Sequence, residues 1–175
     1  MTEQPKKVMI LSGIPACGKS SYAEIATAGV PGDVFSADDH HPKGPYDPRN
    51  LQGAHRACYK AFIAALQAFN ATLLIVDNTN LSAAEIAPYY LAAESFGYVP
   101  TILRFHLSLP VAIVRNRKRR KEVPDTYIFK KHAQFLTRDV LPWWSVEEIF
   151  SPFSEVEASR ARELEMNTYE YRSES

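Results

Sequence analysis

The segment from Gly13 to Ser20 constrains this chain more than any other, because it reads G-x-x-x-x-G-K-S. This spacing is the signature of a phosphate-binding loop, whose glycines let the backbone turn sharply and approach phosphate closely. The Lys19 ammonium is expected to reach the β- and γ-phosphates of a nucleotide, and the Ser20 hydroxyl to bind Mg²⁺. The residues expected to contact the nucleotide here are Gly13, Ile14, Pro15, Ala16, Cys17, Gly18, Lys19, Ser20 and Ser21.

The sequence around the loop has the order of elements that the motif needs. Residues 7–12 form a short apolar run, which predicts a buried strand. Residues 20–28 contain neither proline nor glycine, which favours a helix directly after the loop. A strand, a glycine-rich loop and a helix make up the phosphate-binding unit, and the helix dipole adds attraction for an anion.

The rest of the chain alternates between predicted strands and helices, which is typical of an α/β fold. Apolar runs predict further strands at 34–36, 72–76, 99–106 and 146–150, and helical patterns cover 50–69, 82–96, 109–121, 125–137 and about 154–167. We therefore predict a P-loop NTPase-type open parallel sheet with helices on both faces, as one domain over 1–175. The core covers about 7–150, a basic helical lid about 109–137 and a C-terminal helix about 154–167.

Composition limits the class of protein but not its substrate. A formal net charge of +0 gives no global attraction to nucleic acid or membrane. The only two cysteines, Cys17 and Cys58, fit a reducing compartment better than a disulfide framework. The polar N-terminus, Met1 to Lys7, has no signal-peptide apolar region, and no apolar stretch is long enough to span a membrane. We expect a cytoplasmic protein, and the sequence does not indicate its oligomeric state.

Polar residues follow two of the predicted strands, where parallel sheets bind their ligands. Asp38 is the candidate general base for a hydroxyl acceptor, although an Asp here also suits a turn. Asp77 could hold Mg²⁺ through Ser20 or water, orient the acceptor, or only close the strand end. Asn78 and Asn80 suit an acceptor hydroxyl and suit an Asx turn nearly as well.

A dense basic run lies at the end of the predicted helix 109–121. It contains Arg115, Arg117, Lys118, Arg119, Arg120 and Lys121. A lid that closes over ATP would place an arginine against the transferring phosphoryl group. A solvated helix face and a nucleic-acid patch are the alternatives, and one segment could serve as both lid and patch. His40 and His41 have no third ligand nearby in sequence, so we expect no metal other than Mg²⁺.

Several of these motifs, in this order, resemble one family. They are residues 11–20, Ser36-Ala37-Asp38-Asp39, Ala54-His55, Val76-Asp77-Asn78-Thr79-Asn80 and Arg115-Asn116. Together they resemble the P-loop kinases of the polynucleotide kinase type, and especially the kinase-like domain of the NEDD4-binding protein branch. The resemblance implies ATP and Mg²⁺ as cofactors and phosphoryl transfer to a 5′-hydroxyl of a polynucleotide. It implies Lys19 and Ser20 at the phosphates, Asp38 as base and Arg119 as the lid arginine, with Arg115 also at the nucleotide.

The acceptor is expected to bind along the segment from Asp39 to Arg56 and the end of the strand at 72–76. The residues expected to contact it are Asp39, His41, Tyr46, His55, Asp77, Asn78 and Asn80. The phage-type end-healing kinases carry an arginine where this chain has His41. Because a neutral His holds phosphate more weakly than Arg does, we expect little discrimination for a neighbouring 3′-phosphate on the acceptor.

The sequence thus favours an ATP-dependent kinase that acts on a hydroxyl of a nucleic acid or nucleotide. A kinase of a hydroxymethylated pyrimidine base in DNA, such as 5-hydroxymethyluracil, is an alternative suggested by related phage kinases. A small-molecule kinase is a further alternative. The competing non-enzyme hypothesis is an ATP-binding switch or adaptor, which would not need a candidate base such as Asp38.

Overall fold

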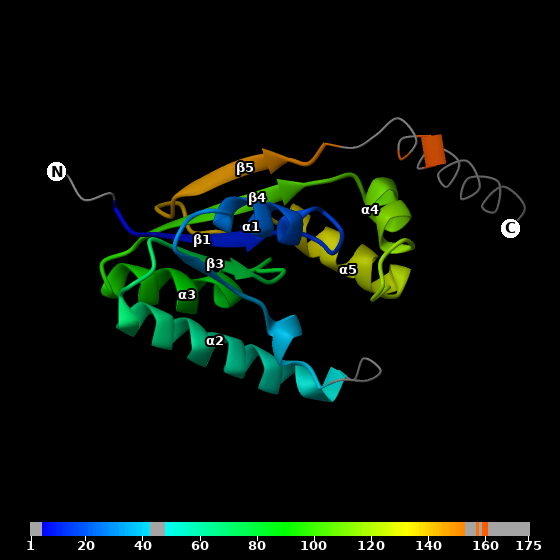
Figure 1. The fold of residues 1–175 in the computed structure, drawn as a ribbon. Helices are drawn as coiled ribbons and strands as arrows, with labels where there is room; N and C mark the ends of the chain where they lie inside the picture. Colours follow the sequence, from blue (N-terminus) through cyan, green and yellow to red (C-terminus); the bar gives the residue numbers. More distant parts are fainter. Residues whose placement is uncertain (1–4, 43–47, 153–156, 158, 161–175) are drawn as a thin grey trace, which may run out of the picture.

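Five parallel strands form the centre of the described part of the molecule, a computed structural model covering residues 5–42, 48–152, 157 and 159–160. The strands are β1 (Lys7–Ser12), β2 (Gly32–Phe35), β3 (Leu73–Asp77), β4 (Val99–His106) and β5 (Val146–Phe150). Their order across the sheet is β2-β3-β1-β4-β5, and every neighbouring pair is parallel. All carboxyl ends of the strands therefore lie along one edge (Figure 1).

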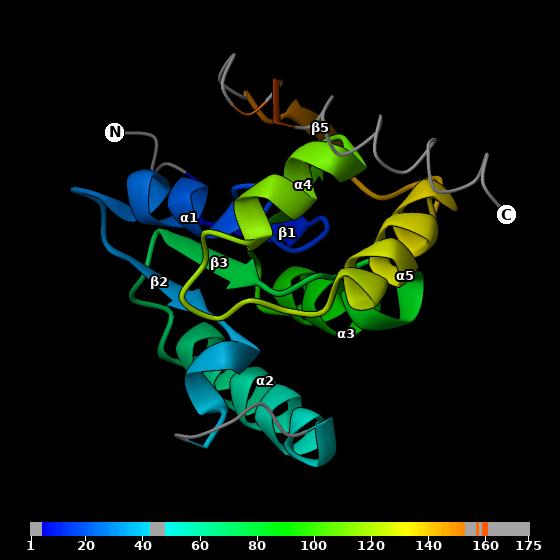
Figure 2. The same cartoon turned by 90° about the vertical axis from the view of Figure 1, so that its right-hand side faces the viewer.

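Helices cover both faces of this sheet. They are α1 (Lys19–Thr27), α2 (Leu51–Ala68), α3 (Ala83–Ser95), α4 (Leu109–Asn116) and α5 (Asp125–Leu136), with short 3₁₀ turns η1 (Ala37–His40) and η2 (Pro48–Asn50). Figures 1 and 2 show α2 and α3 on one side and α1 and α4 on the other. Helix α5 lies beside α3, and Lys131 of α5 pairs with Glu85 of α3 at 3.9 Å. The predicted open parallel sheet with helices on both faces is confirmed.

Burial on both faces explains why the central strand β3 reads as a continuous apolar run. Leu73 to Val76 of β3 are all buried, and alternate side chains enter different cores. Leu74 and Val76 pack in one cluster with Phe62 of α2, whereas Leu73 and Ile75 pack in the other with Ala23 of α1. The sheet is thus a rigid support that presents the strand ends to one site.

Local signals placed helix α3 well. Ser82 accepts from the Glu85 amide at 3.3 Å, and the Glu85 carboxylate accepts from the Ser82 amide at 3.2 Å, which forms a capping box at the start of the helix. Gly97 follows the helix with a φ of 77°, the left-handed conformation that glycine adopts most easily.

The predicted helix 109–121 is wrong at its basic end. Helix α4 ends at Asn116, and residues 117–124 connect it to α5 without helical structure. Cations three and four residues apart repel one another on a helix, which disfavours helix through this run. The buried Asn116 side chain fixes the alternative, because it donates to the Val123 carbonyl at 2.7 Å and accepts from the Val123 amide at 3.1 Å. The basic residues therefore lie on a loop, residues 117–122, closed at its base by this pair.

The ends of helix α2 also differ from expectation. Asn50 stands at the helix start, but its side chain makes no capping hydrogen bond, and the turn η2 leads into the helix instead. Phe69, the last residue of the predicted helix 50–69, lies past the last helical residue with a φ of 51° and is 47% exposed. The predicted C-terminal helix at about 154–167 lies almost wholly outside the described residues.

Candidate functional site

The phosphate loop between β1 and α1 has the geometry that its sequence predicts. Ala16 and Gly18 have positive φ values of 67° and 97°, which turn the chain around a central space. Gly13 needs to be glycine, because an added Cβ would lie 2.6 Å from the Cys17 Sγ. The Lys19 Nζ donates to the Gly13 and Ile14 carbonyls at 2.9 and 3.0 Å. Lys19 is thus buried, with its ammonium directed into the loop that would receive phosphate.

The first residues of α1 bring a hydroxyl against the end of β3. The Ser20 Oγ donates to the Asp77 Oδ2 at 2.6 Å. A hydroxyl and a carboxylate are hard oxygen donors, the type that Mg²⁺ prefers. The two predicted metal ligands are therefore adjacent, and their chemistry fits the ion that a P-loop kinase fold implies.

The two asparagines after β3 are buried and bonded to the protein itself. The Asn78 Oδ1 accepts from the Ala37 amide at 2.8 Å, which ties η1 to the end of β3. The Asn80 Nδ2 donates to the Leu11 carbonyl at 2.8 Å, with a left-handed φ of 44°. These bonds join distant segments of the chain and give both residues a structural role. Their contact with an acceptor stays a prediction.

The candidate base lies on the 3₁₀ turn η1, directly after β2. Asp38 and Asp39 are both exposed there. The Ser36 Oγ accepts from the Asp38 amide at 3.3 Å, so the turn is held by a side-chain cap. The exposed Asp38 side chain can contact a ligand, as a general base must. Its backbone is held by Ser36, and the backbone of the preceding residue, Ala37, is held by Asn78.

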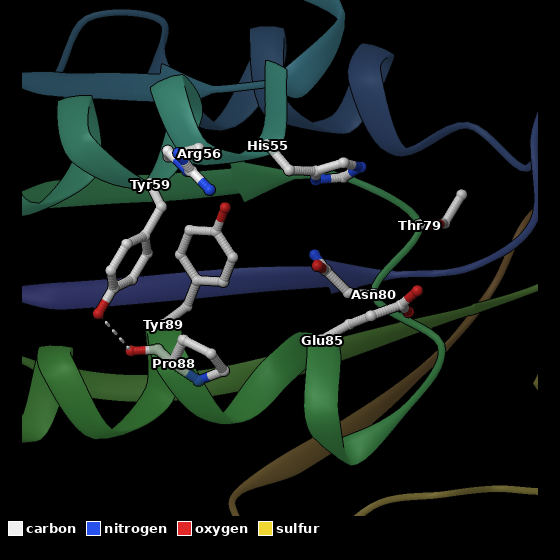
Figure 3. A pocket seen from close by; sticks show the side chains of 8 residues that line it. All are labelled: His55, Arg56, Tyr59, Thr79, Asn80, Glu85, Pro88 and Tyr89. Atoms are coloured by element: carbon white, nitrogen blue, oxygen red, sulfur yellow. Dashed lines mark hydrogen bonds between the residues drawn. The ribbon is translucent and has the colours of Figure 1, made fainter. Parts of the chain in front are cut away.

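A cleft of about 390 Å³ opens between α2, α3 and the loop after β3 (Figure 3). It is lined by His55, Arg56, Tyr59, Thr79, Asn80, Glu85, Pro88 and Tyr89. The Thr79 carbonyl accepts from the Gly13 amide at 2.9 Å, so one wall of the cleft also holds the phosphate loop. At the other end the Tyr59 hydroxyl donates to the Pro88 carbonyl at 3.4 Å and joins α2 to α3.

His55 lies at the meeting point of this cleft and η1. Desolvation by the surrounding chain is the largest influence on it and lowers its pKa below 6.5. Charges on Glu85 and Asp38 oppose this lowering, and those on Lys131 and His41 add to it. His55 is therefore a neutral imidazole near pH 7, surrounded by groups from η1, α3 and α5.

The basic loop 117–122 carries the candidate lid arginines. Arg117 pairs with Asp125 at 3.4 Å. Arg119 is exposed, and within the described residues its side chain has no hydrogen bond or ion pair. Arg115 differs: its guanidinium pairs with Glu157 at 2.8 Å and also donates to the Pro152 carbonyl. The structure therefore leaves Arg119 available for a ligand, whereas Arg115 is bonded within the protein.

Several site residues were not found from the sequence. Tyr59, Glu85, Pro88 and Tyr89 line the cleft, Lys131 approaches it from α5, and Ser151 after β5 donates to the Cys17 carbonyl at 2.5 Å. The helical spacing of residues 85, 88 and 89 was a usable signal, because it puts them on one face of α3. Tyr46, predicted at the acceptor, lies outside the described residues.

The described residues contain neither a cluster of metal-ligating side chains nor a helix suited to a membrane. No group of three or more His, Cys, Asp or Glu side chains there is placed to hold a metal ion. No helix within the same ranges has the length and apolar character to cross a membrane. Both cysteines, Cys17 and Cys58, are free and buried.

Comparison with known proteins places this site in a family. A family model described as an AAA domain, AAA_33, matches residues 8–138. Among solved structures, a chain of the Pnkp1/Rnl/Hen1 RNA repair complex is similar with a TM-score of 0.65 at 22% identity, over 78% of this chain and 46% of that chain. The present chain thus spans less than half the length of that protein.

Two further structures match over nearly their whole length. A gluconokinase from Sinorhizobium meliloti 1021 has a TM-score of 0.59 at 15% identity, covering 95% of this chain and 98% of that chain. A sugar kinase from Janibacter sp. HTCC2649 has a TM-score of 0.63 at 14% identity, covering 91% of this chain and 92% of that chain. At these identities the likeness concerns the fold. The family match extends from β1 to the end of α5, and the chain therefore belongs to the AAA_33 family of AAA domains, with the fold of the P-loop kinases.

Proposed function

We propose that this protein is an ATP-dependent kinase that transfers the γ-phosphate to a hydroxyl group of a nucleic acid or nucleotide. One observation carries the proposal: the phosphate loop and the cleft share a wall. The Gly13 amide is bonded to the Thr79 carbonyl at 2.9 Å, and Thr79 and Asn80 also line the cleft. A phosphate in the loop and a hydroxyl in the cleft would meet across this segment, as direct transfer requires.

The donor side needs only small rearrangements to bind phosphate. Lys19 now donates to two loop carbonyls, and phosphate oxygens would take over these bonds as stronger, charge-assisted ones. Ser20 and Asp77 would hold Mg²⁺, which neutralises charge on the phosphate oxygens. The positive end of α1 points at the same place.

Asp38 is the group that we propose takes the acceptor proton. The acceptor oxygen forms a bond to the γ-phosphorus, its proton passes to the Asp38 carboxylate, and ADP leaves with the electron pair of the broken P–O bond. His55, neutral and close enough for the Asp38 charge to influence its pKa, is suited to orient the hydroxyl by a hydrogen bond.

Arg119 is the proposed lid arginine. The bonds between Asn116 and Val123 anchor the base of loop 117–122. The loop would therefore move as a unit toward the nucleotide phosphates held by the phosphate-binding loop. The exposed Arg119 guanidinium would meet the charge that develops on the transferring phosphoryl group.

The basic loop favours a nucleic acid or nucleotide as the acceptor, since phosphates would be attracted to it. The similar RNA repair structure is in keeping with this choice. A second candidate is a small hydroxyl compound, because the cleft is joined across its far end by Tyr59 and Pro88 and the sugar-kinase folds match over nearly their full length. A hydroxymethylated base in DNA would enter the same cleft.

The test is transfer of radiolabelled γ-phosphate to a panel of 5′-hydroxyl oligonucleotides, nucleosides, hydroxymethyluracil DNA and sugars. We expect label on an acceptor, with salt lowering the rate if that acceptor is DNA or RNA. Label that appears only as free phosphate with every acceptor would support the ATP-binding switch instead. A transfer that occurs only to small molecules and ignores salt would select the second candidate.

A further inference from the structure

We propose that Arg56 binds an oxyanion of the acceptor, so that the cleft selects hydroxyl compounds that already carry a phosphate or carboxylate. This inference rests on the proposed function and names the class of acceptor for the same site. It starts from the unbalanced charge of the cleft. Arg56 lines the cleft, and across the described ranges its side chain has no hydrogen bond or ion pair.

Two other cations near the site, Lys131 and Arg117, are already paired. Lys131 is 3.9 Å from the Glu85 carboxylate, and Arg117 is 3.4 Å from that of Asp125. Arg56 differs from both, because it lines a concave surface and, among the residues that the structure describes, none takes up its guanidinium donors. A guanidinium is suited to bind a phosphate or carboxylate with two parallel hydrogen bonds.

The carboxylate of the cleft does not neutralise Arg56. The Glu85 Oε2 accepts from the Leu81 and Ser82 amides at 2.6 and 3.2 Å, and Oε1 faces Lys131. Figure 3 shows Glu85 and Arg56 at opposite ends of the cleft. Within the described part of the chain, the Arg56 end of the cleft thus stays positive and suits an anionic ligand.

The position of Arg56 separates the two ends of the acceptor. Arg56 lies at the end formed by Tyr59 and Tyr89, whereas Thr79 and Asn80 border the phosphate loop at the other end (Figure 3). The acceptor's hydroxyl would lie toward the loop, and its oxyanion would lie away from it. An apolar ring or sugar face between them would contact the Tyr59 and Pro88 wall.

This proposal differs from the sequence-based prediction about a phosphate on the acceptor. With His41 as the nearest candidate, we expected little discrimination for a phosphate on the acceptor. Arg56 lies on the first turns of α2 rather than in the segment that follows Asp38, and folding brings it into the cleft.

The experiment compares kcat and KM for two acceptor pairs, thymidine with thymidine 3′-monophosphate and glucose with gluconate. We expect the wild type to favour the charged member of at least one pair, with a KM about 10- to 100-fold lower, as for a charged hydrogen bond. A preference for thymidine 3′-monophosphate over thymidine identifies phosphate as the oxyanion that Arg56 binds. A preference for gluconate over glucose identifies carboxylate.

Three variants separate the role of Arg56 from a structural one. Arg56→Gln should remove the preference by raising KM with kcat little changed, and Arg56→Lys should restore part of it. Lys60→Gln is the matched control, because it removes a cation from the same helix outside the cleft and should keep the preference. Equal KM values for both members of both pairs, or an Arg56→Gln preference equal to that of the wild type, would overturn the inference.

A binding measurement distinguishes this inference from the proposed function. If no acceptor is phosphorylated, the proposed function fails, and titration of thymidine 3′-monophosphate and of gluconate is followed by calorimetry. Binding that is lost in Arg56→Gln and kept in Lys60→Gln would still support an oxyanion site. The same affinity in both variants and the wild type would reject it.

Discussion

The phosphate-loop edge and the acceptor side of the site are built in opposite ways. At the phosphate-loop edge, Lys19 is 8% exposed and Asn80 is 3% exposed, and both are bonded to backbone carbonyls. On the acceptor side, Asp38, Arg56 and Arg119 are exposed. The nucleotide phosphates would thus meet groups already in place, whereas the acceptor would meet groups that await a partner.

This difference follows from the energetics of burial. Most buried polar groups in folded proteins have a hydrogen-bond partner, and the bonds of Lys19 and Asn80 hold the phosphate-loop edge in place in the folded protein. An exposed charged group loses little without a partner, because water solvates it. Substitutions at the phosphate-loop edge should therefore change stability as well as activity, and substitutions on the acceptor side should change activity alone.

Arg119→Ala should have the largest effect on turnover. We expect kcat to fall by about 10³-fold or more with little change in thermal stability, because the side chain would act only on the transition state. Single-turnover kinetics and a melting curve would measure the two quantities. Arg120→Ala is the matched control on the same loop. A loss below tenfold for Arg119→Ala would move the lid role to Arg120, Arg117 or Arg115.

Asp38→Asn should lower kcat by about 10²–10⁴-fold, the range for loss of a general base, and leave ATP affinity nearly intact. Lys19→Ala is the contrasting variant from the phosphate-loop edge and should weaken ATP binding and turnover together. Nucleotide titration and steady-state kinetics measure both. If Asp38→Asn raised only the KM for ATP, its carboxylate would serve the nucleotide or metal.

Asn80→Ala should destabilise the fold by about 1–3 kcal/mol, because the Leu11 carbonyl loses its buried donor. Asn80→Gly is the control for the backbone, since glycine accepts the left-handed φ of 44° and Ala does not do so readily. Denaturant unfolding of both variants measures the two contributions. An unfolding free energy equal to that of the wild type in both would show that the edge is not held by this bond.

The smallest expected effect is a pH dependence of stability. Burial lowers the pKa of His132, and desolvation lowers that of His55, below the ordinary 6.5. The unfolded chain then binds these protons more tightly, so the free energy of unfolding should fall as pH drops below about 6.5 toward the folded pKa values. Thermal melting between pH 8 and pH 5, about the range of imidazole titration, should show a steeper fall in the wild type than in a His55→Gln/His132→Gln variant. Parallel curves would contradict the lowered pKa values.

The phosphate-loop edge was more predictable from sequence than the acceptor side. Gly13, Lys19 and Ser20 act through local geometry with fixed spacing, and Asp77 follows a strand that its apolar run reveals. The cleft is different, because Arg56 and Tyr89 come from helices that meet only after the sheet forms. Helix propensity alone predicts a helix through residues 117–121, because it does not show that Asn116 bonds to Val123.

The most direct measurement is mass spectrometry of the products formed from ATP and a mixture of acceptors. The mixture would contain 5′-hydroxyl oligonucleotides, DNA with 5-hydroxymethyluracil, nucleosides, nucleoside 3′-monophosphates and sugar acids. Our account predicts one phosphate on a single hydroxyl of an anionic acceptor, absent with Asp38→Asn. ADP and free phosphate without any phosphorylated acceptor would contradict it.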